Sequence, residues 1–247
     1  MFIAASSRCF SDKTFEEACQ LITDLEYDKV EIWLSEESEH LKPSAVASDP
    51  ERFVTGLRET TRLTPIALHV EEDVDVNTIV GLSKAAKLLR VTQLTVPAAV
   101  IGTPFNTEID RLRASLDILS QDGIRLSIKT QTGHLTEDPH TAVELCQAVK
   151  GLGLTLDPSY YVCGPNRGKS FDQVYPYVCH VQLRDTTPDQ LQVQIGLGEI
   201  DYNRLLASLR RENYERALSV DVIHSAEHEP TRPLEMRKLR MLLETLL

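Results

Sequence analysis

The chain has 247 residues, of which 42% are hydrophobic and 26% charged, and its formal net charge is -11. This length and composition fit one large soluble α/β domain. The negative charge would repel a phosphate backbone, and the sequence has no basic stripe, so we expect no nucleic-acid partner. No apolar run approaches the roughly 20 residues of a membrane-spanning helix, so we expect no membrane partner.

The cysteines also bear on the class of protein. There are five of them, an odd number, and none form a CxxC pair. This pattern argues against a disulfide framework or a zinc cluster and indicates a reducing compartment. The first residues turn polar too soon for a signal peptide. We therefore expect a cytoplasmic protein; the sequence does not indicate its oligomeric state.

Short apolar segments follow one another along the chain and predict eight strands. They are residues 2–6, 29–34, 65–70, 93–96, 124–128, 154–156, 178–183 and 217–223. Helical patterns separate them. One begins at Thr14, where Glu17 completes a capping box, and another at the Asp138-Pro139 pair. Gly123 and Gly151 are placed to end two helices.

Strand and helix alternate without a composition break, which predicts an α/β fold with a single (β/α)8 TIM barrel domain over residues 1–247. The alternative is an open doubly wound sheet, which is weakened because no GxGxxG motif follows residues 2–6. The leucine-rich residues 232–247 predict a last helix that packs across the outside of the barrel.

Polar side chains stand where the predicted strands end, and in a barrel these ends meet at one mouth. They are Glu31, His69, Lys129, Asp157, Gln182, Asp185, Asp221 and His224. Such a rim predicts a site for a hydroxyl-rich or charged small molecule, such as a sugar or polyol. The alternative is that these are only the polar ends of parallel strands.

Four sequence patches carry a resemblance to a known family. They are LTLDPSYY (154–161), HVQLRDT (180–186), GLGEIDY (196–202) and LSVD (218–221). In their order and spacing, and over nearly the whole chain, the sequence resembles the xylose isomerase-like TIM barrels, a sugar isomerase/epimerase superfamily. The resemblance implies a divalent metal such as Mn, Mg or Zn. A Glu after the fifth strand, an Asp after the sixth, a His in the seventh and a Glu in the eighth would hold it. The two glutamates would move protons through a metal-bound enediolate.

At these positions the chain has Lys129, Asp157, Gln182 and Asp221, and a further family histidine falls on Tyr160. Only the aspartate of the sixth strand is kept. A lysine removes an anionic ligand and repels a cation, so we expect no metal and no other cofactor. We expect the Lys129 ammonium to lie near the lost metal and to pair with Asp157, Asp221 or both.

Two functions stay open. In the first, a metal-independent or weakly metal-assisted isomerase or epimerase acts on a sugar or polyol. Its catalytic residues would be Lys129, Asp157 and Asp221, and its substrate-binding residues Glu31, His69, Tyr160, Gln182 and Asp185. In the second, a non-catalytic sugar-binding or scaffold barrel has lost the chemistry. An open mouth flanked by His69, Lys129 and Asp157 would favour the first function, and a mouth plugged by Trp33, Tyr160 or Tyr161 the second. An endonuclease, a third class in the superfamily, is disfavoured by the negative charge.

Other polar residues receive plainer interpretations. We expect Arg184 and Asp185 to form an ion pair on the rim, and Asp201 to cap a helix. The CGPNRGK loop, residues 163–169, is either an anion site or a surface turn. We expect His180 to be structural and His228 to lie in a loop.

Overall fold

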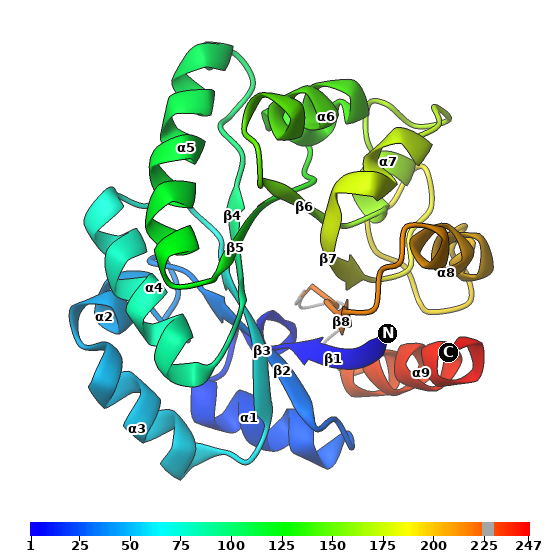
Figure 1. Cartoon of the computed structure of the whole chain (residues 1–247). Coiled ribbons are helices and arrows are strands. Elements are labelled where there is room, and N and C mark those ends of the chain that lie inside the picture. Colours follow the sequence, from blue (N-terminus) through cyan, green and yellow to red (C-terminus); the bar gives the residue numbers. More distant parts are fainter. Residues whose placement is uncertain (224–229) are drawn as a thin grey trace.

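The computed structural model describes residues 1–223 and 230–247, which form a closed barrel of parallel strands surrounded by helices (Figure 1). The strands are β1 (Phe2–Ser6), β2 (Lys29–Leu34), β3 (Thr64–Val70), β4 (Gln93–Pro97), β5 (Arg125–Lys129), β6 (Gly153–Leu156), β7 (Val178–Leu183) and β8 (Ala217–Val220). Each strand pairs with its neighbours in chain order, and β8 closes the barrel against β1. The predicted (β/α)8 barrel is confirmed.

Helices connect the strands and form the outer layer. They are α1 (Phe15–Asp24), α2 (Pro43–Ser48), α3 (Pro50–Thr60), α4 (Val76–Leu89), α5 (Phe105–Gln121), α6 (Pro139–Ala148), α7 (Ser159–Val162), α8 (Tyr202–Arg211) and α9 (Arg232–Leu246), with short 3-10 helices η1 (Ser7–Phe10), η2 (Leu135–Glu137) and η3 (Asp172–Tyr177). The predicted caps are confirmed: Thr14 and Glu17 form a capping box on α1, and Asp138 caps α6. The sequence patterns missed α2 and α7, which are too short to show a helical period.

The predicted eighth strand is wrong at its end. The strand pattern runs to residue 223, whereas β8 ends at Val220. The backbone N–H of Asp221 still donates to the carbonyl of Leu183, but that of Val222 donates to the Cys9 sulfur. The hydrogen-bond ladder between β7 and β8 stops because β7 ends at Leu183. The backbone N–H of Val222 therefore donates to a side chain instead of to a strand.

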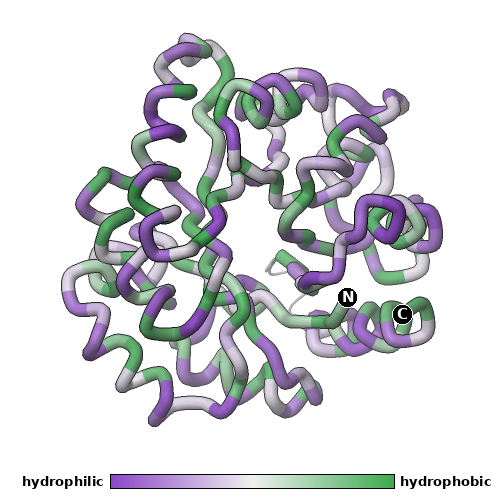
Figure 2. The backbone as a smooth tube through the Cα atoms, viewed as in Figure 1, coloured by the Kyte–Doolittle hydropathy of each residue, from purple (hydrophilic) through white to green (hydrophobic). Residues whose placement is uncertain are grey.

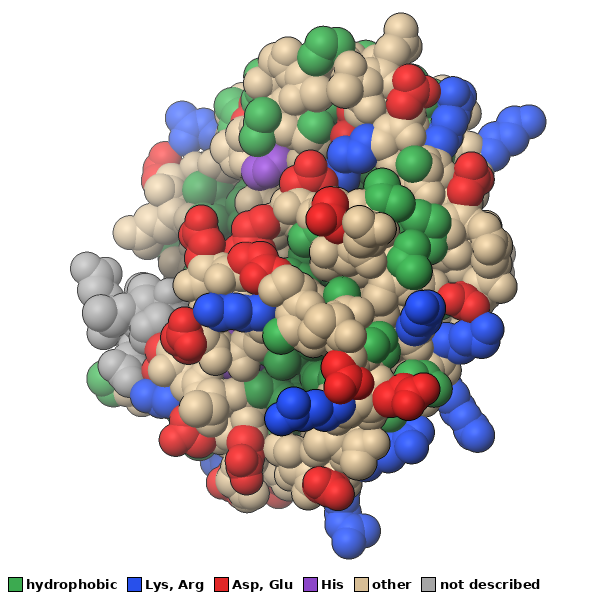
Figure 3. Space-filling view, turned by 90° about the vertical axis from the view of Figure 1, so that its left-hand side faces the viewer, with side chains coloured by type: hydrophobic (Ala, Val, Ile, Leu, Met, Phe, Trp, Pro, Cys, Tyr) green, Lys and Arg blue, Asp and Glu red, His purple; other side chains and the backbone are tan. Residues whose placement is uncertain are grey.

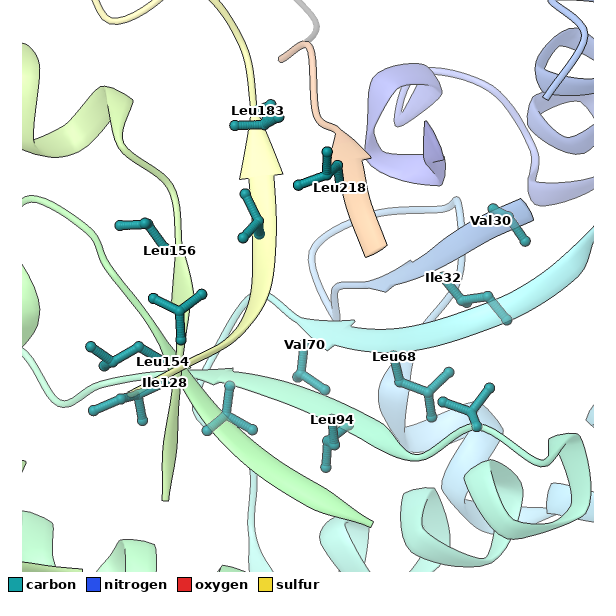
Figure 4. Close-up of a cluster of buried hydrophobic side chains, with 14 of the residues drawn as sticks. Val30, Ile32, Leu68, Val70, Leu94, Ile128, Leu154, Leu156, Leu183 and Leu218 are labelled. Atoms are coloured by element: carbon teal, nitrogen blue, oxygen red, sulfur yellow. The ribbon is translucent and has the colours of Figure 1, made fainter. Parts of the chain in front are cut away.

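The strands bury apolar side chains against the helices and turn polar ones inward. Figure 4 shows apolar residues of several strands gathered in one buried cluster. Between them along the chain lie Gln93, Thr95, Ser127 and Thr155. The hydroxyl of Ser127 bonds Gln93 at 2.6 Å and Thr155 at 2.6 Å, and Thr95 bonds Thr155 at 2.8 Å. The interior of the barrel is therefore a hydrogen-bonded polar column.

The outer helices are amphipathic, and their hydropathy alternates along the chain (Figure 2). Charged side chains of both signs cover the face in Figure 3, with small hydrophobic patches between them. The last helix packs on the barrel as predicted: Met236, Leu239 and Leu243 are buried, and the Tyr27 hydroxyl donates to the Met236 carbonyl at 2.8 Å. No helix in the described part of the chain combines the length and apolar character needed to cross a membrane.

Candidate functional site

The carboxylates of Asp157 and Asp221 are bridged by the guanidinium of Arg184. Its Nη2 atom lies 2.8 Å from Asp157 Oδ2 and 2.6 Å from Asp221 Oδ2. Its Nε donates to the backbone carbonyl of Asp221 at 2.9 Å, and its Nη1 to the Ser159 hydroxyl at 3.2 Å. All three charged side chains are fully buried. The guanidinium therefore places one buried cation between two buried carboxylates.

The backbone explains why these groups meet. Asp157, Arg184 and Asp221 each directly follow a strand, and β6, β7 and β8 are neighbours in the barrel. Asp157 is further fixed because its Oδ1 accepts the backbone N–H of Ser159 at 3.1 Å and also bonds the Ser159 hydroxyl. The Thr130 hydroxyl accepts the backbone N–H of Asp157 at 2.8 Å. The position of the carboxylate is therefore set by local bonds as well as by the arginine.

Lys129 ends β5 and points into the same cluster. Its Nζ lies 3.7 Å from Asp221 Oδ2, and its side chain is only 2% exposed. The expected pairing with Asp221 is present, whereas Asp157 pairs with Arg184. Within the described part of the chain, Lys129 Nζ has no hydrogen-bond partner. The ammonium is thus held near Asp221 by charge, and its N–H groups donate to no atom of the described residues.

A third cation reaches the same oxygen. Arg8 Nη1 lies 3.5 Å from Asp221 Oδ2, so Arg8, Lys129 and Arg184 converge on one atom. Burial by itself would raise the pKa of Asp221, but the charges of Lys129, Arg184 and Arg8 hold that pKa well below its usual range. Asp221 is therefore a carboxylate at any physiological pH.

A second set of polar groups lies beside this cluster. The Gln182 amide nitrogen donates to Glu31 Oε1 at 2.6 Å and to His69 Nδ1 at 3.0 Å. Because His69 Nδ1 accepts a hydrogen bond, its proton is on Nε2, 3.7 Å from Glu71 Oε2. Burial and the charge of Lys129 lower the pKa of His69 to about 4, so the imidazole is neutral at pH 7.

Glu31 lies close to two histidines. His180 Nε2 lies 3.2 Å from Glu31 Oε2, and His69 Nδ1 lies 3.6 Å from Glu31 Oε1. Burial would raise the pKa of Glu31, but His180 outweighs it and the pKa is lowered to about 2. The expectation of a structural role for His180 agrees with this contact.

Sequence reasoning missed Arg8, Glu71 and the true role of Arg184. Glu71 directly follows β3, where it accepts from Arg8 Nη2 at 2.7 Å and from the Trp33 indole nitrogen at 2.7 Å. Burial would raise the pKa of Glu71, but Lys129 and Arg8 lower it to about 2. Glu71 and Arg184 share with Asp157 the position directly after a strand, and that shared position was the available signal.

The predicted rim pair of Arg184 with Asp185 is wrong, because Arg184 is buried in the cluster. Asp185 instead organises the loop after β7. Its carboxylate accepts the backbone N–H groups of Thr186 at 3.1 Å, Gly196 at 2.8 Å and Gly198 at 3.1 Å. A Cβ atom at Gly198 would overlap this carboxylate, so only glycine fits there. Both carboxylate oxygens of Asp185 already accept backbone hydrogen bonds, which argues against the predicted substrate contact at this residue.

The remaining predictions concern a helix cap, the CGPNRGK loop and two histidines. Asp201 caps α8 by accepting from the Arg204 backbone at 2.9 Å, as predicted. In the CGPNRGK loop, Arg167 pairs with Asp189 at 2.8 Å and Lys169 donates to Asn166 at 2.8 Å, which favours a surface turn. The histidines predicted at positions 224 and 228 lie outside the described residues.

Aromatic side chains cover the ion cluster. The centre of the Tyr160 ring lies 6.0 Å from Lys129 Nζ and 5.6 Å from Arg184 Cζ, and the residue is only 8% exposed. The Cζ atom of Arg8 lies over the Trp33 ring, 5.9 Å from its centre. Tyr161 is also buried, but its hydroxyl donates away from the cluster, to the Thr136 carbonyl at 3.1 Å. This is the covered arrangement that we associated with the second function.

Comparison with known proteins places this barrel in a family. The model of the xylose isomerase-like TIM barrels matches residues 19–244. The chain belongs to this family. Among curated proteins no relative matches it.

Solved structures of the same fold cover nearly the whole chain. D-allulose 3-epimerase from Methylomonas sp. in complex with D-allulose has 13% identity and a TM-score of 0.77, over 100% of this chain and 97% of that one. A xylose isomerase domain protein from Alicyclobacillus acidocaldarius has 15% identity and 0.77, over 100% and 98%. The probable 3-DHS dehydratase AsbF from Bacillus anthracis has 15% identity and 0.73, over 97% and 98%. Identities this low establish the shared fold alone.

The donor set does not fit the divalent metal that the resemblance to the xylose isomerase-like family implied. Among the described residues, no group of three or more His, Cys, Asp or Glu side chains is arranged to hold an ion. The space between Asp157 and Asp221 is bridged by a guanidinium, and the ammonium of Lys129 stands beside it. Cationic side chains a few ångströms from a metal position repel the ion.

Proposed function

We propose that this barrel is a non-catalytic member of the xylose isomerase-like family, in which fixed cationic side chains have replaced the metal and ended sugar isomerisation. One observation carries the proposal: Arg184 Nη2 forms ion pairs with both Asp157 and Asp221, at 2.8 and 2.6 Å. Those are the carboxylates that the family resemblance assigns to the metal. A guanidinium cannot be deprotonated in a protein and offers no open coordination position.

The charges also argue against proton transfer. A general base works best when its pKa lies near the working pH. The pKa of Asp221 is held far below that range by Lys129, Arg184 and Arg8. At the other expected proton-carrying position, the chain has Lys129 in place of a glutamate. The pair of carboxylates that would move a proton between two sugar carbons is therefore missing.

A second candidate, a metal-independent reaction on a sugar or polyol, is favoured by Lys129 alone. Its buried Nζ has no hydrogen-bond partner among the described residues. A buried donor left unsatisfied is costly, and a carbonyl or hydroxyl oxygen of a ligand would satisfy it. In this candidate Lys129 polarises the substrate oxygen.

Deuterium exchange separates the candidates. The purified chain is incubated in D2O with D-allulose, D-fructose or L-ribulose, with and without Mn, Mg or Zn, and deuterium at the carbons next to the carbonyl is measured by NMR. Elemental analysis of the same samples measures bound metal. We expect exchange at the rate of the protein-free blank and less than one ion per chain. Metal-dependent exchange would contradict the proposal.

A matched pair of variants identifies the second candidate. The second candidate predicts deuterium exchange without metal. If Lys129→Met loses this exchange and Lys150→Met keeps it, Lys129 takes part in the reaction. Lys150 is exposed at the surface, so its replacement removes the same charge without touching the cluster.

A further inference from the structure

A groove of about 490 Å³ opens beside α7 and α8, and none of the residues of the ion cluster lines it. Its walls come from α7, residues 168–171, η3, the loop after β7 and the first turn of α8. Figure 1 shows α7 and α8 on the same side of the barrel. The volume lies within the roughly 300–1,000 Å³ of small-molecule sites. The groove is therefore large enough for a ligand of its own.

Aromatic rings form one wall of the groove. The Phe171 ring contacts two tyrosine rings, with centroid distances of 5.2 Å to Tyr161 and 6.0 Å to Tyr175. Tyr161 and Tyr175 are buried, whereas Phe171 is only half-buried. Phe171 therefore presents its ring to the groove while the two tyrosines support it. Leu205 of α8 adds apolar surface.

The rim of the groove has more acidic than basic groups. The charged lining residues are Lys169, Asp172, Glu199, Asp201 and Arg204. Arg204 is already committed, because its Nη2 bonds both oxygens of Asp172, at 3.0 and 3.2 Å. The ammonium of Lys169 donates to Asn166.

Glu199 differs from the other acids of the rim. Asp172 is paired, and Asp201 caps α8. The carboxylate of Glu199 has no ion pair or hydrogen bond to another described side chain, and the residue is exposed. The rim therefore presents one uncommitted negative charge next to an aromatic wall.

We propose that this groove binds a small organic cation, an ammonium group on an apolar body. The ammonium contacts Glu199, and the apolar body lies on the Phe171 ring. The carboxylate attracts the positive group and the aromatic face packs against the apolar body, whereas an anion would meet the excess acidic charge of the rim. The net charge of -11 raises the local concentration of cations around the whole molecule.

The test uses three probes that share a phenyl ring and differ in charge: phenethylamine, phenethyl alcohol and hydrocinnamate. Each is titrated into the ¹⁵N-labelled full chain, and amide shifts are followed by NMR. We expect phenethylamine to bind most tightly, with shifts at Gly168, Ser170, Phe171 and the first turn of α8. Glu199→Gln should weaken its binding about fivefold and leave that of phenethyl alcohol unchanged. Phe171→Ala should weaken the binding of both.

The control is Glu212→Gln, which removes the same charge from an exposed residue at the other end of α8 and should leave the affinity unchanged. Binding of hydrocinnamate as tight as that of phenethylamine would overturn the proposal. Shifts that map outside the groove, equal effects of Glu199→Gln and Glu212→Gln, or no saturable shifts with any probe would also overturn it.

Discussion

Arg184 Nη2 lies 2.6 Å from Asp221 Oδ2, closer than either Lys129 or Arg8, which approach the same oxygen at 3.7 and 3.5 Å. The arginine is therefore the principal counter-ion of this site. Lys129 stands at one ligand position of the family, and Arg184, directly after β7, forms ion pairs with the side chains at two others, Asp157 and Asp221.

Replacing Arg184 by methionine should destabilise the fold strongly. The variant leaves Asp157 and Asp221 buried without their main partner, and breaking a buried ion pair on one side costs about 3–5 kcal/mol. Urea unfolding measures the change. Arg113→Met is the control: that side chain is 56% exposed, and the change should stay within about 0.5 kcal/mol. Adding Asp157→Asn and Asp221→Asn to Arg184→Met should recover part of the loss; equal stability of the native chain and Arg184→Met would refute the role given to the arginine.

The stability of the chain should fall between pH 6.5 and pH 4 because of His69. Its pKa drops from the usual 6.5 to about 4 on folding, through burial and the charge of Lys129. The unfolded chain thus takes up a proton at a higher pH than the folded chain. The contribution is complete above about pH 6.5, is lost as the pH falls toward 4, and amounts to about 3 kcal/mol.

The check on this pH dependence is the slope of unfolding free energy against pH. In His69→Gln the slope over this range should be shallower by about one proton. His140→Gln, at an exposed histidine, should keep the native slope. Identical slopes in all three proteins would show that His69 does not titrate as stated.

The loop after β7 should depend on Gly198. A Cβ atom there would overlap the Asp185 carboxylate, so Gly198→Ala should cost about 1–3 kcal/mol in thermal or urea unfolding. Gly56→Ala is the matched control, because its new methyl group meets nothing within 4 Å and lies in a helix. That substitution should stabilise by about 0.5–1 kcal/mol. A neutral Gly198→Ala would mean that the loop is not held by Asp185.

Restoring the family glutamate should not by itself restore a metal site. In Lys129→Glu the Arg184 guanidinium still bridges Asp157 and Asp221, so no Mn²⁺ binding is expected. The double variant Lys129→Glu/Arg184→Met brings three carboxylates together, leaves only Arg8 of the three cations that approach Asp221, and should bind Mn²⁺. Calorimetric titration of both variants distinguishes them; binding by the single variant would mean that the arginine moves aside readily.

The sequence was sufficient for the barrel because each strand is an apolar run between strong helix signals such as Thr14 and Asp138. It also located the cluster, since Lys129, Asp157 and Asp221 stand at or next to the carboxyl ends of strands. The sequence did not predict that Arg184 points into the cluster, because the direction of a side chain after a strand depends on how the chain leaves the sheet. Arg8 was out of reach for another reason: its contact with Asp221 joins residues at opposite ends of the chain, and no local pattern records such a contact.

The most direct measurement is a calorimetric titration of the native chain with Mn²⁺ at neutral pH. We expect no stoichiometric heat of binding, because cationic side chains already neutralise Asp157 and Asp221. One ion bound per chain, lost in Asp157→Asn and Asp221→Asn, would contradict it.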